Sequence, residues 1–180
     1  IMLMKYFLLF ILPISLSAEA QVVISVSTDR WHGFERDKIK FDDREVWIVK
    51  PKQTLEGKPW IWKAYFPDWH TDMDSILLSR GFHLAYIETN DMFGSPKAMQ
   101  IWNRFHTWMT SNGFAEKVAL EGISRGGLYV YNWAKRNPLK VSCIYAEAPV
   151  CNTSSWPGGK GKGKGSPSDW QLLQKHMDMS

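Results

Sequence analysis

The chain has 180 residues, of which 44% are hydrophobic, 22% are charged and 14% are aromatic. This composition is typical of a globular protein and argues against a disordered, collagen-like or disulfide-stapled chain. Lys and Arg outnumber Asp and Glu by 22 to 18. Lys5 and the three lysines of a glycine-rich run at residues 158–165 account for this whole surplus. Because the basicity is so local, a nucleic-acid-binding protein is disfavoured.

The first residues have the pattern of a secretory signal peptide. A short basic start at residues 2–5 precedes an apolar run at residues 6–16, and Ala18-Glu19-Ala20 matches a signal-peptidase site. The apolar run is shorter than the ~20 residues that a membrane-spanning helix needs. We therefore expect residues 1–20 to be removed and residues 21–180 to be secreted or periplasmic, with no contact to the membrane.

The first predicted element is an antiparallel hairpin. Residues 38–41 and 45–49 alternate apolar and polar side chains on either side of the turn sequence Asp42-Asp43-Arg44. This alternation indicates two strands of which one face is buried.

After the hairpin, predicted strands alternate with predicted helices. Ser95 and Pro96 have the pattern of an N-cap followed by Pro at the first helical position, and the helix they begin carries an aromatic stripe as far as Gly113. The alternation predicts an α/β fold with a mainly parallel sheet and helices on both faces. In chain order, the expected elements are a strand at 60–66, a helix at 72–80 with Met73, Ile76 and Leu77 at helical spacing, a strand at 82–87, the helix from Pro96, a strand at 117–120, a helix at 126–136, a strand at 141–146, a loop at 152–168 and a short helix from about Trp170.

The two cysteines, Cys143 and Cys151, are expected to be separate thiols. A strand that begins at Val141 advances about 3.3 Å per residue, which places the two Cα atoms beyond the ~7 Å limit for a disulfide unless the chain doubles back at Pro149. The sequence contains no CxxC or HxxxH pair, so it predicts no zinc site and no other cofactor.

Residues 122–126 read Gly-Ile-Ser-Arg-Gly, a GxSxG motif between a predicted strand and a predicted helix, and Gly127 follows directly. Glycines permit a sharp turn at positions where a Cβ would clash with neighbouring backbone. The turn brings Ser124 to the carboxyl edge of the sheet and to a helix N-terminus, where free N–H groups stabilise an oxyanion. We expect Ser124 to be a nucleophile and the Arg125 N–H to be the first oxyanion donor. The alternative is a glycine-rich turn that contains an incidental serine.

The chain resembles the α/β-hydrolase superfamily. The motif at residues 120–127 carries the resemblance, which extends over about residues 38–151. The segments Phe-Gly-Ser-Pro-Lys at 93–97 and Ser-Trp-Pro-Gly-Gly-Lys at 155–160 are similar to exported bacterial hydrolases of the prolyl-oligopeptidase-like and carbohydrate-esterase groups. The resemblance implies a three-layer fold whose mostly parallel sheet starts with an antiparallel hairpin. It also implies acyl transfer, in which Ser124 attacks a carbonyl, a His acts as base and an Asp or Glu orients that His.

The resemblance further implies a second oxyanion donor in the loop after the third strand, here residues 66–70. Pro67 has no N–H, so the backbone N–H of Asp68 or Trp69 is expected to serve. Arg125 is similar to the Arg that follows the nucleophile in glucuronoyl methylesterases, whose substrates carry a sugar acid. The alternative for Arg125 is a surface residue on the first helical turn.

In this superfamily the acid follows the seventh strand and the His follows the eighth. The predicted strands reach only the sixth, and two more strand-helix units need about 60 residues at roughly 30 each. We therefore expect an incomplete fold whose last strands are missing, so that residues 21–180 are the N-terminal portion of the domain and have little or no activity alone. Asp169 and His176 do not complete the triad, because they lie about 10 Å apart along one short helix.

Loops at the expected active edge supply the candidate substrate contacts. Lys160 and Lys162 lie in a run that either holds an anionic group or is a solvated loop. Trp69 and Trp156 are candidates for stacking on a sugar ring, whereas most of the ten tryptophans are expected to be structural: Trp60, Trp62, Trp102, Trp108 and Trp133.

The function that the sequence predicts is a secreted serine hydrolase acting on a carboxylic ester of a carbohydrate. The alternatives are a prolyl-oligopeptidase-like serine peptidase and a non-catalytic carbohydrate-binding protein with a hydrolase fold.

Overall fold

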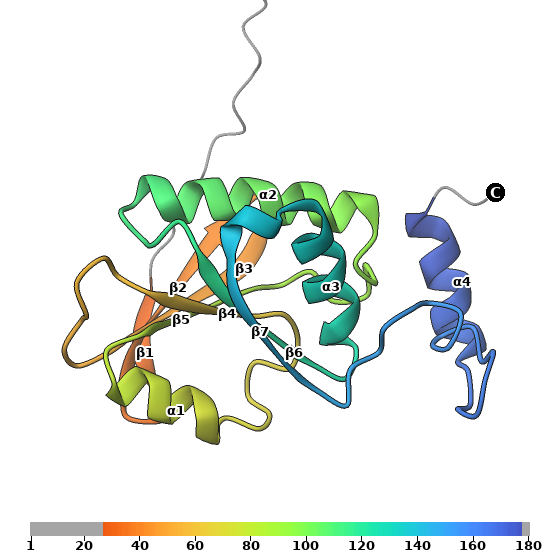
Figure 1. Ribbon diagram of the computed structural model, residues 1–180, viewed down its shortest axis with the longest axis horizontal. Coiled ribbons are helices and arrows are strands. Elements are labelled where there is room, and N and C mark those ends of the chain that lie inside the picture. The colour runs from red at the N-terminus through yellow and green to blue at the C-terminus, as the bar shows by residue number, and fades with distance from the viewer. Residues whose placement is uncertain (1–26, 178–180) are drawn as a thin grey trace, which may run out of the picture.

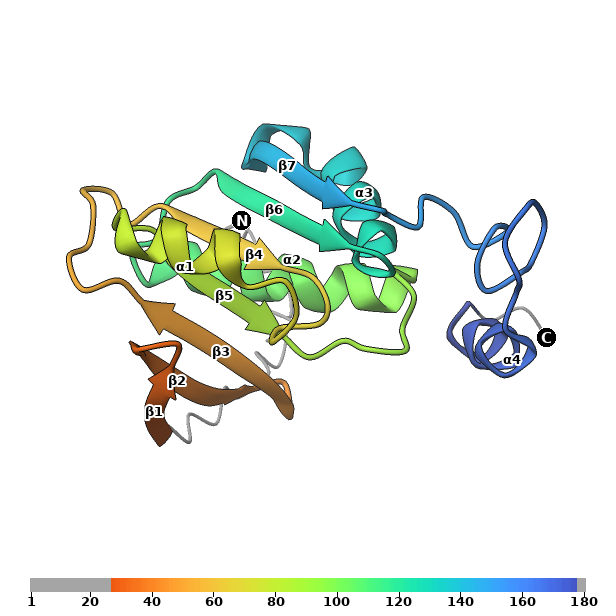
Figure 2. The ribbon, with the colours of Figure 1, turned by 90° about the horizontal axis from the view of Figure 1, so that it is seen from below.

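The computed structural model describes residues 27–177, so the predicted signal peptide lies outside the described residues. Within this range seven strands form one sheet in the order β1-β2-β3-β5-β4-β6-β7. Helix α1 lies on one face of the sheet, and α2 and α3 lie on the other (Figures 1 and 2). Helix α4 stands apart from the sheet at the end of a long loop. The predicted three-layer α/β architecture is confirmed.

The N-terminal strands are antiparallel: β1 Ser27–Trp31, β2 Phe34–Phe41 and β3 Arg44–Lys50. The predicted hairpin is β2 and β3, which pair from Phe41 and Arg44 outward. Asp42 and Asp43 both have positive φ, 50° and 59°, as a two-residue hairpin turn of the primed type requires. Strand β1 was not predicted, because only the last of its five residues is buried and its sequence therefore shows no alternation.

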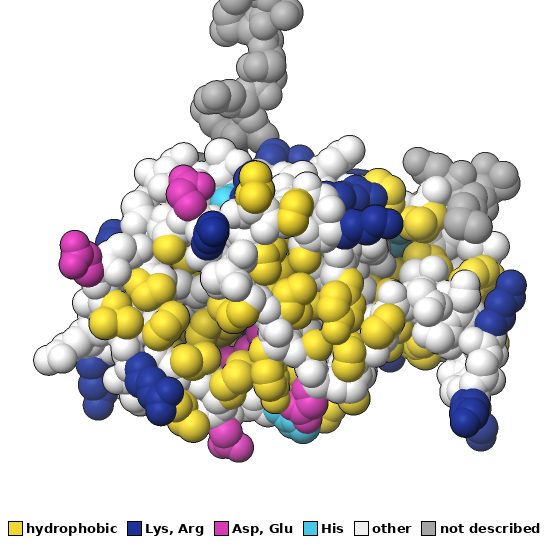
Figure 3. Space-filling model, viewed as in Figure 1, with side chains coloured by type: hydrophobic (Ala, Val, Ile, Leu, Met, Phe, Trp, Pro, Cys, Tyr) yellow, Lys and Arg dark blue, Asp and Glu magenta, His cyan; other side chains and the backbone are white. Residues whose placement is uncertain are grey.

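The remaining four strands run parallel and confirm the mainly parallel sheet: β4 Trp60–Lys63, β5 His83–Ile87, β6 Val118–Ile123 and β7 Val141–Glu147. Strand β3 joins the hairpin to this group by pairing antiparallel with β5. Strand β7 forms one edge of the sheet, opposite the edge formed by β1, and four of its seven residues are exposed. Figure 3 shows this side of the molecule as a largely apolar surface.

The helices begin and end close to the predicted positions. They are α1 Asp72–Ser79, α2 Pro96–Ser111, α3 Gly126–Arg136 and α4 Pro167–His176. The Ser95 hydroxyl caps α2 by accepting a hydrogen bond from the Ala98 N–H at 3.3 Å. Helix α4 begins earlier than predicted because the Ser166 hydroxyl accepts from the Asp169 N–H at 3.4 Å and so forms its N-cap. None of the described helices has both the length and the apolar character to cross a bilayer.

The larger core lies between the sheet and the pair α2 and α3, and aromatic side chains fill it. The rings of Trp62 and Trp102 stack with centroids 4.1 Å apart, and Trp133 packs edge-on against Trp62 at 5.3 Å. The structural role predicted for most tryptophans is confirmed, since Trp60, Trp62, Trp102 and Trp133 are at most 1% exposed.

The smaller core lies under α1 and contains charge. The spacing of Met73, Ile76 and Leu77 predicts the helix correctly, but its buried positions are Asp74 and Leu78, and Ile76 is 51% exposed. An acidic residue therefore occupies a core-facing position of α1.

Candidate active site

Ser124 occupies the turn between β6 and α3, at the carboxyl edge of the sheet. Its φ is 50°, a left-handed conformation that costs a non-glycine residue roughly 1–3 kcal/mol. Three backbone hydrogen bonds hold it there. The Ser124 N–H donates to Glu147 O at 2.9 Å, and Ser124 O accepts from Val150 N at 2.8 Å and from Gly127 N at 3.1 Å. The surrounding chain thus imposes a strained turn on the predicted nucleophile.

The neighbouring glycines differ in how strictly the turn requires them. A Cβ on Gly122 would lie 2.6 Å from Val130 Cγ2, and a Cβ on Gly127 would lie 2.6 Å from Val150 O. A Cβ on Gly126 would meet Ala64 Cβ at 3.4 Å, which is close to ordinary contact. The turn therefore excludes a side chain at Gly122 and Gly127 more strongly than at Gly126, although Gly126 belongs to the GxSxG motif and Gly127 follows it.

The Arg125 N–H lies at the start of α3. Within residues 27–177 it donates no backbone hydrogen bond, so its role as an oxyanion donor stays a prediction. The Arg125 side chain lies over the ring of Trp156, with its guanidinium carbon 4.2 Å from the ring centroid. This cation–π contact gives the Arg125 side chain a fixed partner beside the cavity.

The predicted second donor is less well placed. The Trp69 N–H donates to Phe66 O at 3.0 Å, so a turn already uses it in this conformation. The Asp68 carboxylate accepts from Trp31 Nε1 at 2.6 Å, which fixes the start of the same loop against β1. Tyr65 N lies 3.8 Å from where a Cβ on Gly126 would be, beside the first turn of α3. The family pattern points to the residues around Pro67 and therefore does not indicate Tyr65.

A cavity of about 400 Å³ opens at Ser124. Of the predicted substrate contacts, Trp156, Lys160 and Lys162 line it together with Ser124, whereas Trp69 does not. Trp69 is 47% exposed and packs against His70 with ring centroids 4.0 Å apart. The loop after β7 therefore reaches back over the proposed nucleophile, as its position in the fold predicts.

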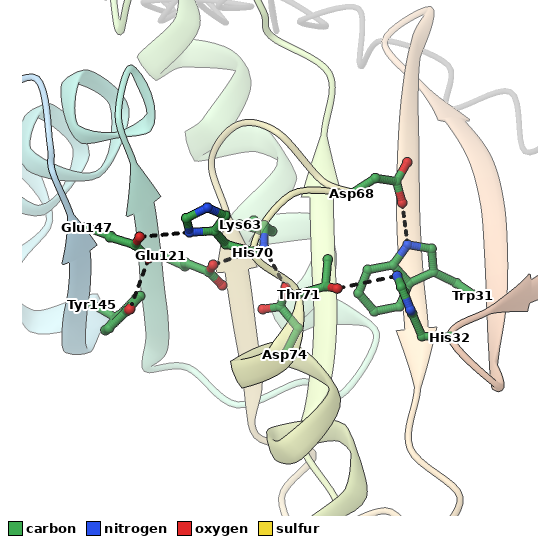
Figure 4. A network of polar contacts seen from close by, with 10 residues as sticks. All are labelled: Trp31, His32, Lys63, Asp68, His70, Thr71, Asp74, Glu121, Tyr145 and Glu147. Carbon is green, nitrogen blue, oxygen red and sulfur yellow. Dashed lines mark hydrogen bonds and ion pairs between the residues drawn. The ribbon is translucent and has the colours of Figure 1, made fainter.

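An unforeseen pair of His70 and Glu147 lies at the same edge of the sheet (Figure 4). His70 Nδ1 is 2.7 Å from Glu147 Oε1, and both side chains are partly exposed. The backbone O of Glu147 is the group that accepts from Ser124 N–H, so this pair adjoins the nucleophile turn. The sequence did not reveal it, because the two residues lie in loops and strands far apart along the chain.

His83 and His106 are packed against other elements of the fold. Burial lowers the pKa of His83 and of His106, so both favour the neutral form, and His106 Nε2 lies 3.0 Å from Glu116 O. The Asp169 carboxylate accepts from the Ser166 hydroxyl at 2.6 Å. Asp169 is therefore part of the N-terminal cap of α4. This contact agrees with the prediction that Asp169 and His176 do not complete the triad.

A second charged cluster lies inside the α1 side of the sheet (Figure 4). Lys63 Nζ is 2.5 Å from Asp74 Oδ2 and 3.0 Å from Glu121 Oε1, and all three side chains are at most 1% exposed. Burial, with the neighbouring Asp74 carboxylate, raises the pKa of Glu121 to about 8. A proton on Glu121 lets one lysine and two carboxyl groups be buried without net charge.

The described residues contain no group of His, Cys, Asp or Glu side chains arranged to hold a metal ion. Cys143 and Cys151 are both free and exposed, as the strand geometry predicts.

Searches with the sequence find no matching family model and no matching curated protein. Among solved structures, the chain is similar to wild-type Cfl2 from Burkholderia cenocepacia, with a TM-score of 0.51 and 15% identity over 71% of this chain and 46% of that one. It is also similar to a cold-adapted esterase from an Arctic intertidal metagenomic library, with a TM-score of 0.53 and 11% identity over 68% of this chain and 63% of that one. The chain thus spans about half to two thirds of the length of these proteins.

Proposed function

We propose that this chain, which has the α/β-hydrolase fold, carries the nucleophile of a secreted serine hydrolase that cleaves a carboxylic ester. The observation that carries the proposal is the strained turn at Ser124. A serine with a φ of 50°, held between β6 and α3 and lining a cavity, is a costly arrangement. A strained conformation of this kind clusters at functional sites.

The proposed reaction proceeds through an acyl-enzyme. Ser124 Oγ attacks the ester carbonyl carbon, and its proton passes to a general base as the new C–O bond forms. The Arg125 N–H stabilises the resulting oxyanion. The C–O bond to the alcohol then breaks, and the base returns the proton to the leaving alcohol. Water, activated by the same base, hydrolyses the acyl-enzyme and restores Ser124.

The general base has two candidate locations. The resemblance to the superfamily places it on a histidine that follows later strands of the sheet. His70 is the candidate within the described residues, because the Glu147 carboxylate binds its Nδ1 and leaves Nε2 as an acceptor. His70→Ala distinguishes the two. A fall in kcat of about a thousandfold assigns the base to His70, and a fall of less than about tenfold assigns it elsewhere.

Aromatic rings beside the cavity support a carbohydrate as the part that carries the ester. Trp156 lines the cavity of Ser124, and Lys160 lines both this cavity and a second one of about 480 Å³ that Trp170 also lines. Tryptophans beside two neighbouring cavities suit contacts with successive sugar rings. The predicted export of the chain agrees with a polymer substrate outside the cell.

The test compares the full-length protein with Ser124→Ala on p-nitrophenyl acetate, on acetylated xylan and on a prolyl p-nitroanilide. We expect Ser124→Ala to lower ester turnover by about a thousandfold or more. Ser111→Ala, an exposed serine at the end of α2, is the matched control and should retain full turnover. Faster cleavage of the prolyl amide would support the peptidase instead. Sugar binding without Ser124-dependent turnover would support the non-catalytic alternative.

A further inference from the structure

The lining of the Ser124 cavity is charged with one sign only. Arg125, Lys160, Lys162 and Lys164 all line it, and the lining includes neither Asp nor Glu. None of these four cations forms an ion pair with any of residues 27–177. From this lining we infer that the site selects esters that carry a fixed negative charge, and that these cations bind it. The inference rests on the proposed function for the identity of the reacting bond.

The base of the lysine loop is fixed, although its tip is open. Ser166 N donates to Pro157 O at 2.9 Å, and a Cβ on Gly159 would lie 2.9 Å from Gly165 N. The two sides of the loop therefore meet at a narrow neck. Gly161 and Gly163 have no atom within 4 Å of a Cβ position, so the tip that carries the lysines extends into solvent. Figure 3 shows Lys and Arg side chains at this end of the molecule.

Trp156 connects this loop to the nucleophile turn. Its ring lies 5.7 Å from that of buried Phe93 and 4.2 Å from the guanidinium carbon of Arg125. The ring thus packs the loop against the segment between β5 and α2 and holds the arginine at the cavity. A stacked guanidinium keeps its N–H edges available, and these donate in pairs to an oxyanion.

The acid nearest the turn does not neutralise the cavity. Glu147 adjoins Ser124 through its backbone, but its carboxylate binds His70 and is not part of the cavity lining. Four cations around one cavity repel one another, and an anionic ligand relieves this repulsion. Each exposed pair contributes little alone, but several that converge on one group add specificity and raise the association rate.

The shared chemistry of the predicted ligand is an oxyanion on the acyl side of the ester, such as a carboxylate or a sulfate. The primary test measures kcat/KM of the full-length protein for p-nitrophenyl pentanoate and for mono-p-nitrophenyl glutarate, which differ mainly in a terminal carboxylate. Replacing Lys160, Lys162 and Lys164 together by Gln should lower the ratio of kcat/KM for the glutarate ester to kcat/KM for the pentanoate ester by at least about tenfold. The corresponding Arg replacements should retain the preference.

The matched control replaces three exposed lysines away from the cavity, Lys52, Lys117 and Lys135, by Gln, which changes the net charge equally. An equal loss in this control, or no preference for the glutarate ester in the wild type, overturns the inference. In either case Ser124-dependent cleavage of the neutral ester would leave the proposed function intact.

A binding measurement separates the inference from catalysis. Calorimetry with glutarate and with inorganic sulfate on Ser124→Ala should show binding that weakens with salt and is lost with the lysine replacements. Tighter binding of glutarate identifies a carboxylate ester, and tighter binding of sulfate identifies a sulfated one. Such binding without ester turnover by the wild type would refute the proposed function alone. No binding of either anion overturns the inference.

Discussion

Two charged clusters of this molecule differ in burial and in whether their charges are paired. The cluster of Lys63, Asp74 and Glu121 is buried, and its lysine faces two carboxyl groups. The lysines of residues 158–165 are exposed, and no carboxylate lines their cavity. Buried charges are tolerated only when they are paired, whereas exposed charges cost little without a partner. The buried cluster therefore contributes to the stability of the fold, whereas the exposed lysines are available to bind a ligand.

Lys63→Met tests the buried side of this comparison and has the largest expected effect. It removes the only cation of the cluster and leaves two carboxyl groups in the core. We expect a loss of ~3–5 kcal/mol in the free energy of unfolding, measured by urea titration. Lys50→Met is the control, because Lys50 is 40% exposed and pairs with Glu35 and Asp37 at the surface. It should cost about 1 kcal/mol or less. Equal losses would show that the buried cluster has no special role.

The pH dependence of the free energy of unfolding also tests the buried cluster. The pKa of Glu121 is about 8 in the folded chain and 4.5 ordinarily. Between these values the folded chain retains a proton that the unfolded chain has released, so stability falls as pH rises. The loss is at most ~1.4 kcal/mol per pH unit. The measurement is the free energy of unfolding as a function of pH, for the wild type and for Glu121→Gln. Subtracting the Glu121→Gln curve from the wild-type curve removes the contribution of the other titrating groups. If this difference stays flat or rises from pH 5 to 8, the raised pKa of Glu121 is contradicted.

Gly127 links the nucleophile turn to the chain that leads into the lysine loop. In Gly127→Ala the new Cβ would lie 2.6 Å from Val150 O and 2.7 Å from Pro149 Cβ, so the backbone must move. We expect a loss of ~1–3 kcal/mol in unfolding free energy and a fall in ester turnover. Gly126→Ala, whose nearest contact is 3.4 Å, should cost less than about 1 kcal/mol. A larger loss in Gly126→Ala would reverse this ranking of the two glycines.

The sequence predicts those parts of the fold that depend on neighbouring residues. The cap at Ser95, the bounds of α3 and the alternation of strands and helices all arise from signals a few residues long. The GxSxG turn is local too, which is why the position of Ser124 could be derived without a structure.

Features that join distant segments escaped prediction. Asp74 faces the core only because Lys63 and Glu121 lie opposite it, and no periodicity in α1 reveals that. His70, in the loop before α1, meets Glu147, the last residue of β7, and the Trp69 N–H donates to Phe66 O within a turn that the family pattern does not show. The side chains around the candidate active site, at the carboxyl edge of the sheet, come from several loops. The positions of these loops relative to one another depend on the whole fold.

The smallest expected effect is on stability when the lysines of residues 158–165 change. Replacing Lys160, Lys162 and Lys164 by Gln should alter the free energy of unfolding by less than about 0.5 kcal/mol, because these exposed side chains make no ion pair with the described residues. A slight gain is the favoured direction, since the change relieves repulsion between like charges. Urea unfolding at low and high salt measures it, and the gain should shrink as salt screens the lysines. A loss comparable to that of Lys63→Met would show that the loop supports the fold, and the contrast between the two clusters would then be false.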